Sequence, residues 1–126
     1  MTAKDTVRRF VDEAVNGGHD EVVDELFAPA LTTFVRDWFG SFRGSFPDMH
    51  MELLELVGGG DTAVGRFACS GTHEGEWRGH PPTGRRFENV AEVYFFRFDG
   101  EQIAELWGIE DTLERFRQLG LEPGDL

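Results

Sequence analysis

The chain has 126 residues, 40% of them hydrophobic, which predicts a single domain over residues 1–126 with a modest core. Twelve Lys and Arg residues against 24 Asp and Glu residues give a net charge of −12, which argues against nucleic acid or an anionic membrane as partner. No segment approaches the roughly 18 consecutive apolar residues of a membrane span. Because Met1–Asp5 also shows no apolar leader, we expect a cytoplasmic protein.

The first 45 residues are predicted to form helices. A first helix would end at Asn16-Gly17-Gly18, and its apolar residues recur at three- and four-residue steps: Val7, Phe10, Val11, Ala14 and Val15. A short second helix covers Val22–Phe27 and stops before Pro29, because proline disrupts a helix interior. A third helix carries one broad apolar face of Leu31, Phe34, Val35, Trp38, Phe39 and Phe42.

Four strands are expected next, over residues 50–57, 62–70, 86–98 and 102–109, separated by turn-forming residues. Asp99-Gly100 is a typical hairpin turn, and a closing helix over 111–119 would stop at Gly120. Helices followed by strands in hairpin order predict an α+β fold. In this fold the N-terminal helices pack on one face of a curved antiparallel sheet, and a cone-shaped pocket lies between them.

A glycine- and proline-rich connection from Gly71 to Gly84 separates the second and third strands. Its fourteen residues include four glycines and two prolines, which fix backbone shapes that other residues rarely adopt. His73 lies near its start, where it is either a base that acts near neutral pH or a group that holds the loop in shape. The sequence therefore predicts a long, shaped loop.

Short motifs follow one another through nearly all of the chain after residue 42. They are Phe46-Pro47-Asp48, Ser70-Gly71-Thr72-His73-Glu74-Gly75, Gly79-His80-Pro81-Pro82-Thr83-Gly84, Arg97-Phe98-Asp99-Gly100, Ile103, Glu105, Trp107, Asp111 and Gln118-Leu119-Gly120. This series resembles the SnoaL-like polyketide cyclases, within the group that shares the nuclear-transport-factor-2-like fold. The resemblance implies a cone-shaped α+β barrel whose pocket holds a flat polyketide.

The resemblance also implies a reaction. Known members close a ring of a polyketide methyl ester by intramolecular aldol condensation, without a metal ion or organic cofactor. Their general acid/base is a carboxylate near the end of the last strand, which Asp111 matches here, four residues after Trp107. One carboxylate can remove a proton beside a carbonyl and then protonate the new alkoxide. The alternative for Asp111 is to cap the last helix.

One departure from the family concerns the connection between the second and third helices. Ala28–Thr33 leads almost directly into the third helix, so a segment that helps to wall the pocket in the family is missing. This shortening would leave the pocket open, leave it to be completed by a second chain, or remove the original chemistry.

Eight further residues are expected to line the pocket around a small hydrophobic or aromatic molecule: Trp107, Glu105, Phe95, Phe34, Trp38, Phe46, His50 and His73. Glu105, Trp107 and Asp111 are placed there because they share one face of the last strand with Ile103 and Ile109. Aromatic walls suit a flat ligand, and a histidine can hydrogen-bond its oxygen. The alternatives are core packing for the aromatic rings and a cross-strand ion pair for Glu105.

Two other classes of function stay open. One is a non-catalytic ligand-binding or dimerisation module. The other is an epoxide hydrolase or dehydratase on the same cone, which needs an Asp-Arg-Asp cluster or a His-Asp pair. The four histidines show no metal-binding spacing, so no metal site is expected.

A homodimer through the sheet is also expected. Four residues on the parity opposite Phe95 are too apolar to face water, namely Val90, Tyr94, Phe96 and Phe98. Burial against a second copy of the chain would cover them.

Overall fold

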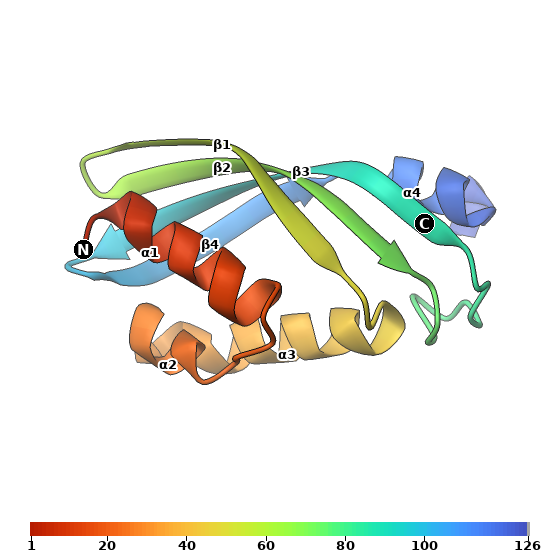
Figure 1. Ribbon diagram of the computed structural model, residues 1–126, viewed down its shortest axis with the longest axis horizontal. Helices are drawn as coiled ribbons and strands as arrows, with labels where there is room; N and C mark the ends of the chain where they lie inside the picture. The colour runs from red at the N-terminus through yellow and green to blue at the C-terminus, as the bar shows by residue number, and fades with distance from the viewer. Residues whose placement is uncertain (126) are drawn as a thin grey trace.

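A four-stranded antiparallel sheet in the order β1-β2-β3-β4 forms one layer of the structure, and helices cover one of its faces (Figure 1). The computed structural model describes residues 1–125. The strands are β1 (His50–Gly59), β2 (Thr62–Thr72), β3 (Arg86–Asp99) and β4 (Gln102–Glu110). Each begins at the residue that the sequence predicts, and the α+β fold is confirmed.

The helices lie before and after the sheet in the chain. They are α1 (Ala3–Arg9), which continues into the π-helical turn η1 (Phe10–Val15), then α2 (Val22–Leu26), α3 (Pro29–Ser45), α4 (Thr112–Leu119) and the 3-10 turn η2 (Pro123–Asp125). A capping box of Thr2 and Asp5 starts α1, and Pro29 occupies the first turn of α3. In Figure 1, α1 to α3 lie beneath the sheet and α4 lies beyond its far end.

The core lies between the sheet and the N-terminal helices. All five residues of the predicted first stripe are buried, with at most 3% of their surface exposed. The ring of Phe10 contacts three others, with centroid distances of 4.9 Å to Phe27, 5.4 Å to Phe39 and 6.2 Å to Phe96. Fully burying a phenylalanine contributes roughly 1.5–3 kcal/mol, so this cluster joins η1, α3 and the sheet firmly.

A β-bulge at Ala104 reverses which residues of β4 face the helices. Phe98 pairs with Ile103 while the adjacent Arg97 pairs with Glu105, so β4 contains one extra residue between these pairs. Ile103 is buried, whereas Trp107 and Ile109 are 53% and 67% exposed. One extra residue moves all later side chains to the opposite face. The prediction that one inward face carries Ile103, Glu105, Trp107, Ile109 and Asp111 is therefore wrong.

The apolar residues offered as the reason for a dimer are buried within one chain. Val90, Tyr94, Phe96 and Phe98 are at most 9% exposed, because they face the core beneath the sheet. That argument for a dimer is therefore wrong. The helix-free face instead carries a row of paired residues that crosses all four strands, namely Val57, Val64, Phe95 and Trp107.

The connection between β2 and β3 is attached to the end of α3. The backbone N–H groups of Glu74 and Gly75 donate to the Ser45 carbonyl at 3.0 and 3.1 Å, and the Ser45 hydroxyl donates to the Glu76 carbonyl. A Cβ atom at Gly75 would collide with the Gly44 carbonyl oxygen. This loop is therefore fixed where it passes the helix.

Among the described residues, no helix has the length and apolarity needed to cross a bilayer.

We expect Gly75→Ala to lower the free energy of unfolding by about 1–3 kcal/mol, because the added methyl group forces the loop away from α3. Gly40→Ala is the matched control. A Cβ there meets nothing within 4 Å, and replacing a glycine inside α3 should stabilise the helix by about 0.5–1 kcal/mol. Urea denaturation measures both changes. Equal stability of the Gly75→Ala variant and the parent would contradict the fixed loop.

Candidate functional site

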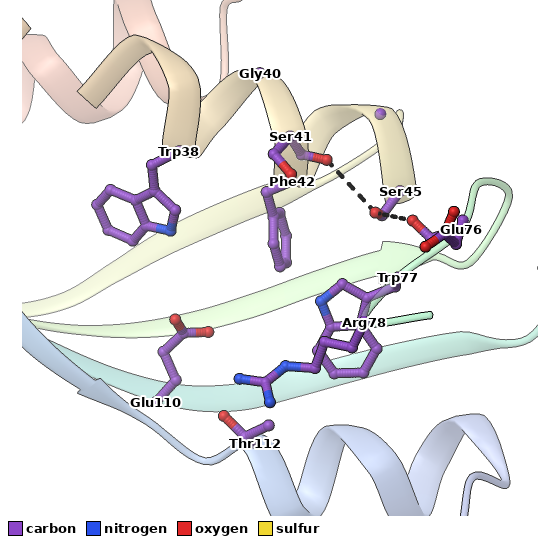
Figure 2. A pocket seen from close by; sticks show the side chains of 11 residues that line it. Trp38, Gly40, Ser41, Phe42, Ser45, Glu76, Trp77, Arg78, Glu110 and Thr112 are labelled. Carbon is purple, nitrogen blue, oxygen red and sulfur yellow. Dashed lines mark hydrogen bonds between the residues drawn. The ribbon is translucent and has the colours of Figure 1, made fainter. Parts of the chain in front are cut away.

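An open cavity of about 520 Å³ lies where α3, the β2–β3 connection, the end of β4 and the start of α4 meet (Figure 2). Aromatic rings and polar groups share its walls: Trp38, Gly40, Ser41, Phe42, Gly44, Ser45, Glu76, Trp77, Arg78, Glu110 and Thr112. Its size suits a small organic molecule. Figure 2 shows the Glu110 carboxylate pointing into this space, opposite Trp38 and Phe42.

Two glutamates face each other beneath this cavity. Glu92 of β3 pairs directly with Glu110 of β4, and both lie on the helix-covered face. Arg115 from α4 bridges them, with its Nη2 2.5 Å from Glu92 Oε2 and its Nη1 2.8 Å from Glu110 Oε1. The Tyr94 hydroxyl donates to Glu92 Oε1 at 2.7 Å. Like charges directly opposite each other repel, so the pair depends on the guanidinium between them.

Local sequence explains how this cluster forms. Asp111 caps α4, since its side chain accepts from the Glu114 N–H at 3.1 Å, and α4 then carries Arg115 back over the sheet. The guanidinium carbon lies 4.7 Å from the Phe87 ring centre and 5.3 Å from that of Phe42. Aromatic faces attract a cation, so these rings help to hold Arg115 in a fully buried position.

The glycine at position 108 makes room for the tyrosine of the cluster. Gly108 pairs with Tyr94 across β3 and β4, and the tyrosine ring lies where a Cβ at Gly108 would be. The ring can therefore lie flat across β4, with its hydroxyl on Glu92. A side chain at position 108 would displace the ring and break this hydrogen bond.

The charges of the cluster do not balance when both glutamates are ionised. Burial raises the pKa of Glu92 above its usual 4.5, and the facing Glu110 carboxylate adds to that rise, while Arg115 opposes it. Burial alone would lower the pKa of Arg115, but both carboxylates raise it, so Arg115 stays charged. Burial also raises the pKa of Tyr94, which stays protonated and donates to Glu92. Glu92 is thus the carboxyl that burial favours as neutral.

Glu110 differs from Glu92 in its access to the cavity. The Glu110 side chain is 29% exposed, against 4% for Glu92. Arg115 binds only one of its carboxylate oxygens, and the second makes no hydrogen bond to any residue in the described range 1–125. Glu110 is thus a fixed carboxylate with one oxygen free to meet a ligand.

The structure places Asp111 away from this cavity. Its carboxylate is exposed and caps α4, which was the alternative reading of the sequence. Glu105 lies on the helix-free face and pairs with Arg97 at 3.3 Å, again the alternative reading. Phe95 and Trp107 stack on that same face, with ring centres 4.4 Å apart. The reversal after Ala104 is the reason that Glu105, Trp107 and Asp111 do not line the inner pocket. Phe95 lies on the helix-free face because its neighbours on β3, Tyr94 and Phe96, face the core.

Three of the expected pocket aromatics still meet at the edge of β4. A smaller cavity of about 180 Å³ there is lined by Phe34 and Trp38 of α3, by Trp107, and by Glu110. Trp38 and Glu110 also line the larger cavity, so the two spaces adjoin at these side chains. Both cavities are open to solvent.

The remaining expected residues have other positions. Phe46 is fully buried and contacts the rings of Phe87 and His73, so it belongs to the core. His50 is exposed at the start of β1 and lines neither cavity. His73 is buried, and its Nδ1 accepts from the Thr83 N–H at 3.2 Å. Burial lowers the pKa of His73, so it remains neutral and holds the loop.

Sequence reasoning missed Glu92, Glu110 and Arg115. One signal was available, since Glu92 interrupts the alternation of apolar residues along β3 at a position that should face the core. A carboxylate at such a position needs a partner, and Arg115 is the buried cation that supplies it. Among residues 1–125, no group of three or more His, Cys, Asp or Glu side chains is placed to hold a metal ion.

A sequence profile of the SnoaL-like polyketide cyclases matches residues 5–119. The chain belongs to this family. The chain is also similar to the aklanonic acid methyl ester cyclase of Streptomyces peucetius, with 26% identity over 133 residues, covering 94% of this chain and 91% of that protein.

Two solved structures are also similar to this chain over nearly its whole length. TsrD of Streptomyces laurentii matches with a TM-score of 0.84 at 28% identity, covering 94% of this chain and 95% of the other. IdmH of Streptomyces antibioticus, described as a candidate polyketide cyclase, also gives a TM-score of 0.84, at 27% identity, over 96% of this chain and 100% of the other. The nuclear-transport-factor-2-like cone is therefore the fold of this SnoaL-like chain.

Glu92→Gln tests the charge imbalance of the cluster. Because the pKa of Glu92 is raised on folding, its stabilising effect is complete below 4.5 and is lost as pH rises through the raised value. The parent should therefore lose stability relative to the Glu92→Gln variant as pH rises above about 5. Urea denaturation across this range measures the difference.

Glu88→Gln, which replaces an exposed carboxylate of the same strand, is the matched control. The opposite result would be a parent that becomes more stable relative to the Glu92→Gln variant as pH rises. It would mean that the attraction to Arg115 exceeds the cost of burying a charge and keeps both glutamates ionised.

Proposed function

We propose that this SnoaL-like chain is a cofactor-independent cyclase-type enzyme, with Glu110 as general acid/base on a small, flat carbonyl compound. The observation that carries the proposal is the Glu110 carboxylate, which Arg115 holds by one oxygen while the other faces a cavity with aromatic walls. Asp111 was the expected acid/base, and its capping position favours its neighbour instead.

The proposed reaction uses Glu110 twice. Its free oxygen removes a proton from the carbon beside a carbonyl group, and the resulting enolate attacks a second carbonyl of the same molecule. Glu110 then returns the proton to the new alkoxide, so that a carbon–carbon bond forms and no atom is lost. Arg115 fixes the carboxylate in place, and a correctly oriented base lowers the entropic part of the barrier.

The aromatic side chains would position the ligand. Trp38 and Phe42 come from α3, and Trp77 comes from the loop that is attached to α3. Flat rings stack well on such side chains, which restrict a planar substrate to a few orientations. The relative from Streptomyces peucetius is named as a cyclase of an acid methyl ester, which agrees with a carbonyl substrate of this kind.

Proton exchange tests this proposal without knowledge of the natural substrate. We expect the protein to accelerate exchange of the α-protons of 2-tetralone in deuterated water, followed by NMR. Glu110→Gln should reduce that acceleration by about 100-fold or more, the usual contribution of a general base.

Asp111→Asn is the matched control, since it changes the adjacent carboxylate on α4. It should retain most of the exchange activity after correction for any loss of stability. Loss of exchange in Asp111→Asn but not in Glu110→Gln would return the role to Asp111. Binding of 2-tetralone without accelerated exchange would favour a non-catalytic binding module.

One observation favours a second candidate function. The expected alternative, an epoxide hydrolase on this cone, needs an Asp-Arg-Asp cluster, and Glu92, Arg115 and Glu110 form a similar arrangement with glutamates in place of the aspartates. However, Glu92 is nearly fully buried, and the cavity beside it holds only about 10 Å³, less than a water molecule and an epoxide require. The cyclase-type reaction needs Glu110 alone at the cavity, so we place it first. Hydrolysis of styrene oxide would reverse this order.

We also propose a homodimer through the helix-free face of the sheet. Its row of Val57, Val64, Phe95 and Trp107 lies between the ion pairs Arg66–Glu55 and Arg97–Glu105. An apolar centre with a charged rim is typical of a surface that a second copy covers.

Light scattering should therefore give twice the chain mass of 14.2 kDa. Ile109→Arg, on this face and 67% exposed, should yield the monomer, because it places a charge in the interface. Leu113→Arg on α4 is the control and should leave the mass unchanged. A parent of 14.2 kDa at all concentrations would exclude the dimer.

A further inference from the structure

Arg78 stands at the tip of a fixed turn beside the cavity. Trp77 and His80 exchange two backbone hydrogen bonds, of 3.0 and 2.8 Å, and leave Arg78 and Gly79 as the central residues of a two-residue turn. Their φ angles are +51° and +83°, the left-handed values that such turns require. Glycine meets this requirement easily and arginine rarely does, so the identity of residue 78 calls for a reason beyond the turn.

The side chain of Arg78 gives that reason. Its guanidinium carbon lies 5.5 Å from the Trp77 ring centre, and the side chain lines the 520 Å³ cavity. Figure 2 shows the guanidinium pointing toward the side of the cavity formed by Glu110 and Thr112. Within residues 1–125, Arg78 makes no ion pair, whereas Arg115 is buried and pairs with two carboxylates. Arg78 is therefore the cavity cation with donors available to a ligand.

A second donor lies beside Arg78. Thr112 lines the same wall as the first residue of α4, and Asp111 already caps the N-terminus of that helix. The Thr112 hydroxyl makes no hydrogen bond within the described chain. Glu76 and Glu110 line the cavity as well, and Glu110 is paired with Arg115 through one of its oxygens. A ligand oxygen between Arg78 and Thr112 would thus meet donors, while Glu110 faces the reacting carbon.

We propose that Arg78 binds an anionic oxygen of the ligand, so that this cavity takes flat aromatic carboxylates in preference to their neutral esters. The inference deepens the proposed function, because it names the chemical class of the molecule on which Glu110 acts. Arginine can bind a carboxylate through two parallel N–H···O bonds, which would also fix the orientation of the ring system above Trp77.

Binding of 2-naphthoate and methyl 2-naphthoate, measured by ligand-observed NMR, tests this preference. The parent should bind the carboxylate more tightly than the ester. Arg78→Ala should weaken binding of the carboxylate by about tenfold or more and that of the ester by less than about twofold, since only the carboxylate loses a charge-assisted hydrogen bond. Arg78→Lys should restore part of the loss.

Arg85→Ala is the matched control. It removes the same charge from the same loop, but the Arg85 side chain lies against Gly120 and does not line the cavity. It should leave the ratio of the two affinities unchanged, which separates direct contact from long-range attraction. An unchanged ratio in Arg78→Ala, or failure of the parent to bind either compound, would overturn the inference.

The test is also separable from the proposed function. Glu110→Gln should still bind 2-naphthoate, because binding does not require proton transfer. If the parent exchanges the protons of 2-tetralone but shows no carboxylate preference, the role of Arg78 is wrong and that of Glu110 stands. If it prefers the carboxylate but exchanges no protons, the cavity binds acids without acting on them.

Discussion

Arg115 carries one positive charge into an interior that also holds the carboxylates of Glu92 and Glu110, and the site depends on this contact. Without the guanidinium, two like charges would face each other across adjacent strands. Removing one member of a buried ion pair typically costs about 3–5 kcal/mol, because the remaining charge has no partner. Arg115 therefore couples the position of α4 to the inner face of the sheet, and its aromatic neighbours limit its movement.

The same contact determines the chemistry that the cavity can support. Arg115 leaves Glu92 beneath the surface and presents one oxygen of Glu110 to the cavity, so two identical side chains have different roles. The environment makes the difference, since burial disfavours the charged form of Glu92. The loop attached to Ser45 then places Trp77 and Arg78 on the other side of the cavity. Base, aromatic wall and cation thus come from separate parts of the chain.

Membership of the SnoaL-like polyketide cyclases accounts for the cone-shaped fold. The residues that line the inside of the cone depend on the individual sequence. The short turn between α2 and α3 is one such individual feature. Gly108 also shapes the site, because its missing side chain lets the Tyr94 ring lie across β4 and reach Glu92. Local features of this kind decide which carboxylate meets a ligand.

The sequence by itself determined the elements and the family. Apolar periodicity, turn residues and caps act over a few residues, and they predicted the starts of all four strands and the stripe from Val7 to Val15. Only the tertiary structure decided the faces of β4, because the bulge at Ala104 arises from pairing with β3 and leaves no local signal. Because of this one extra residue, Glu110 lies at the cavity and Asp111 does not. The link from Arg115 to Glu92 spans 23 positions, and folding alone brings such residues together.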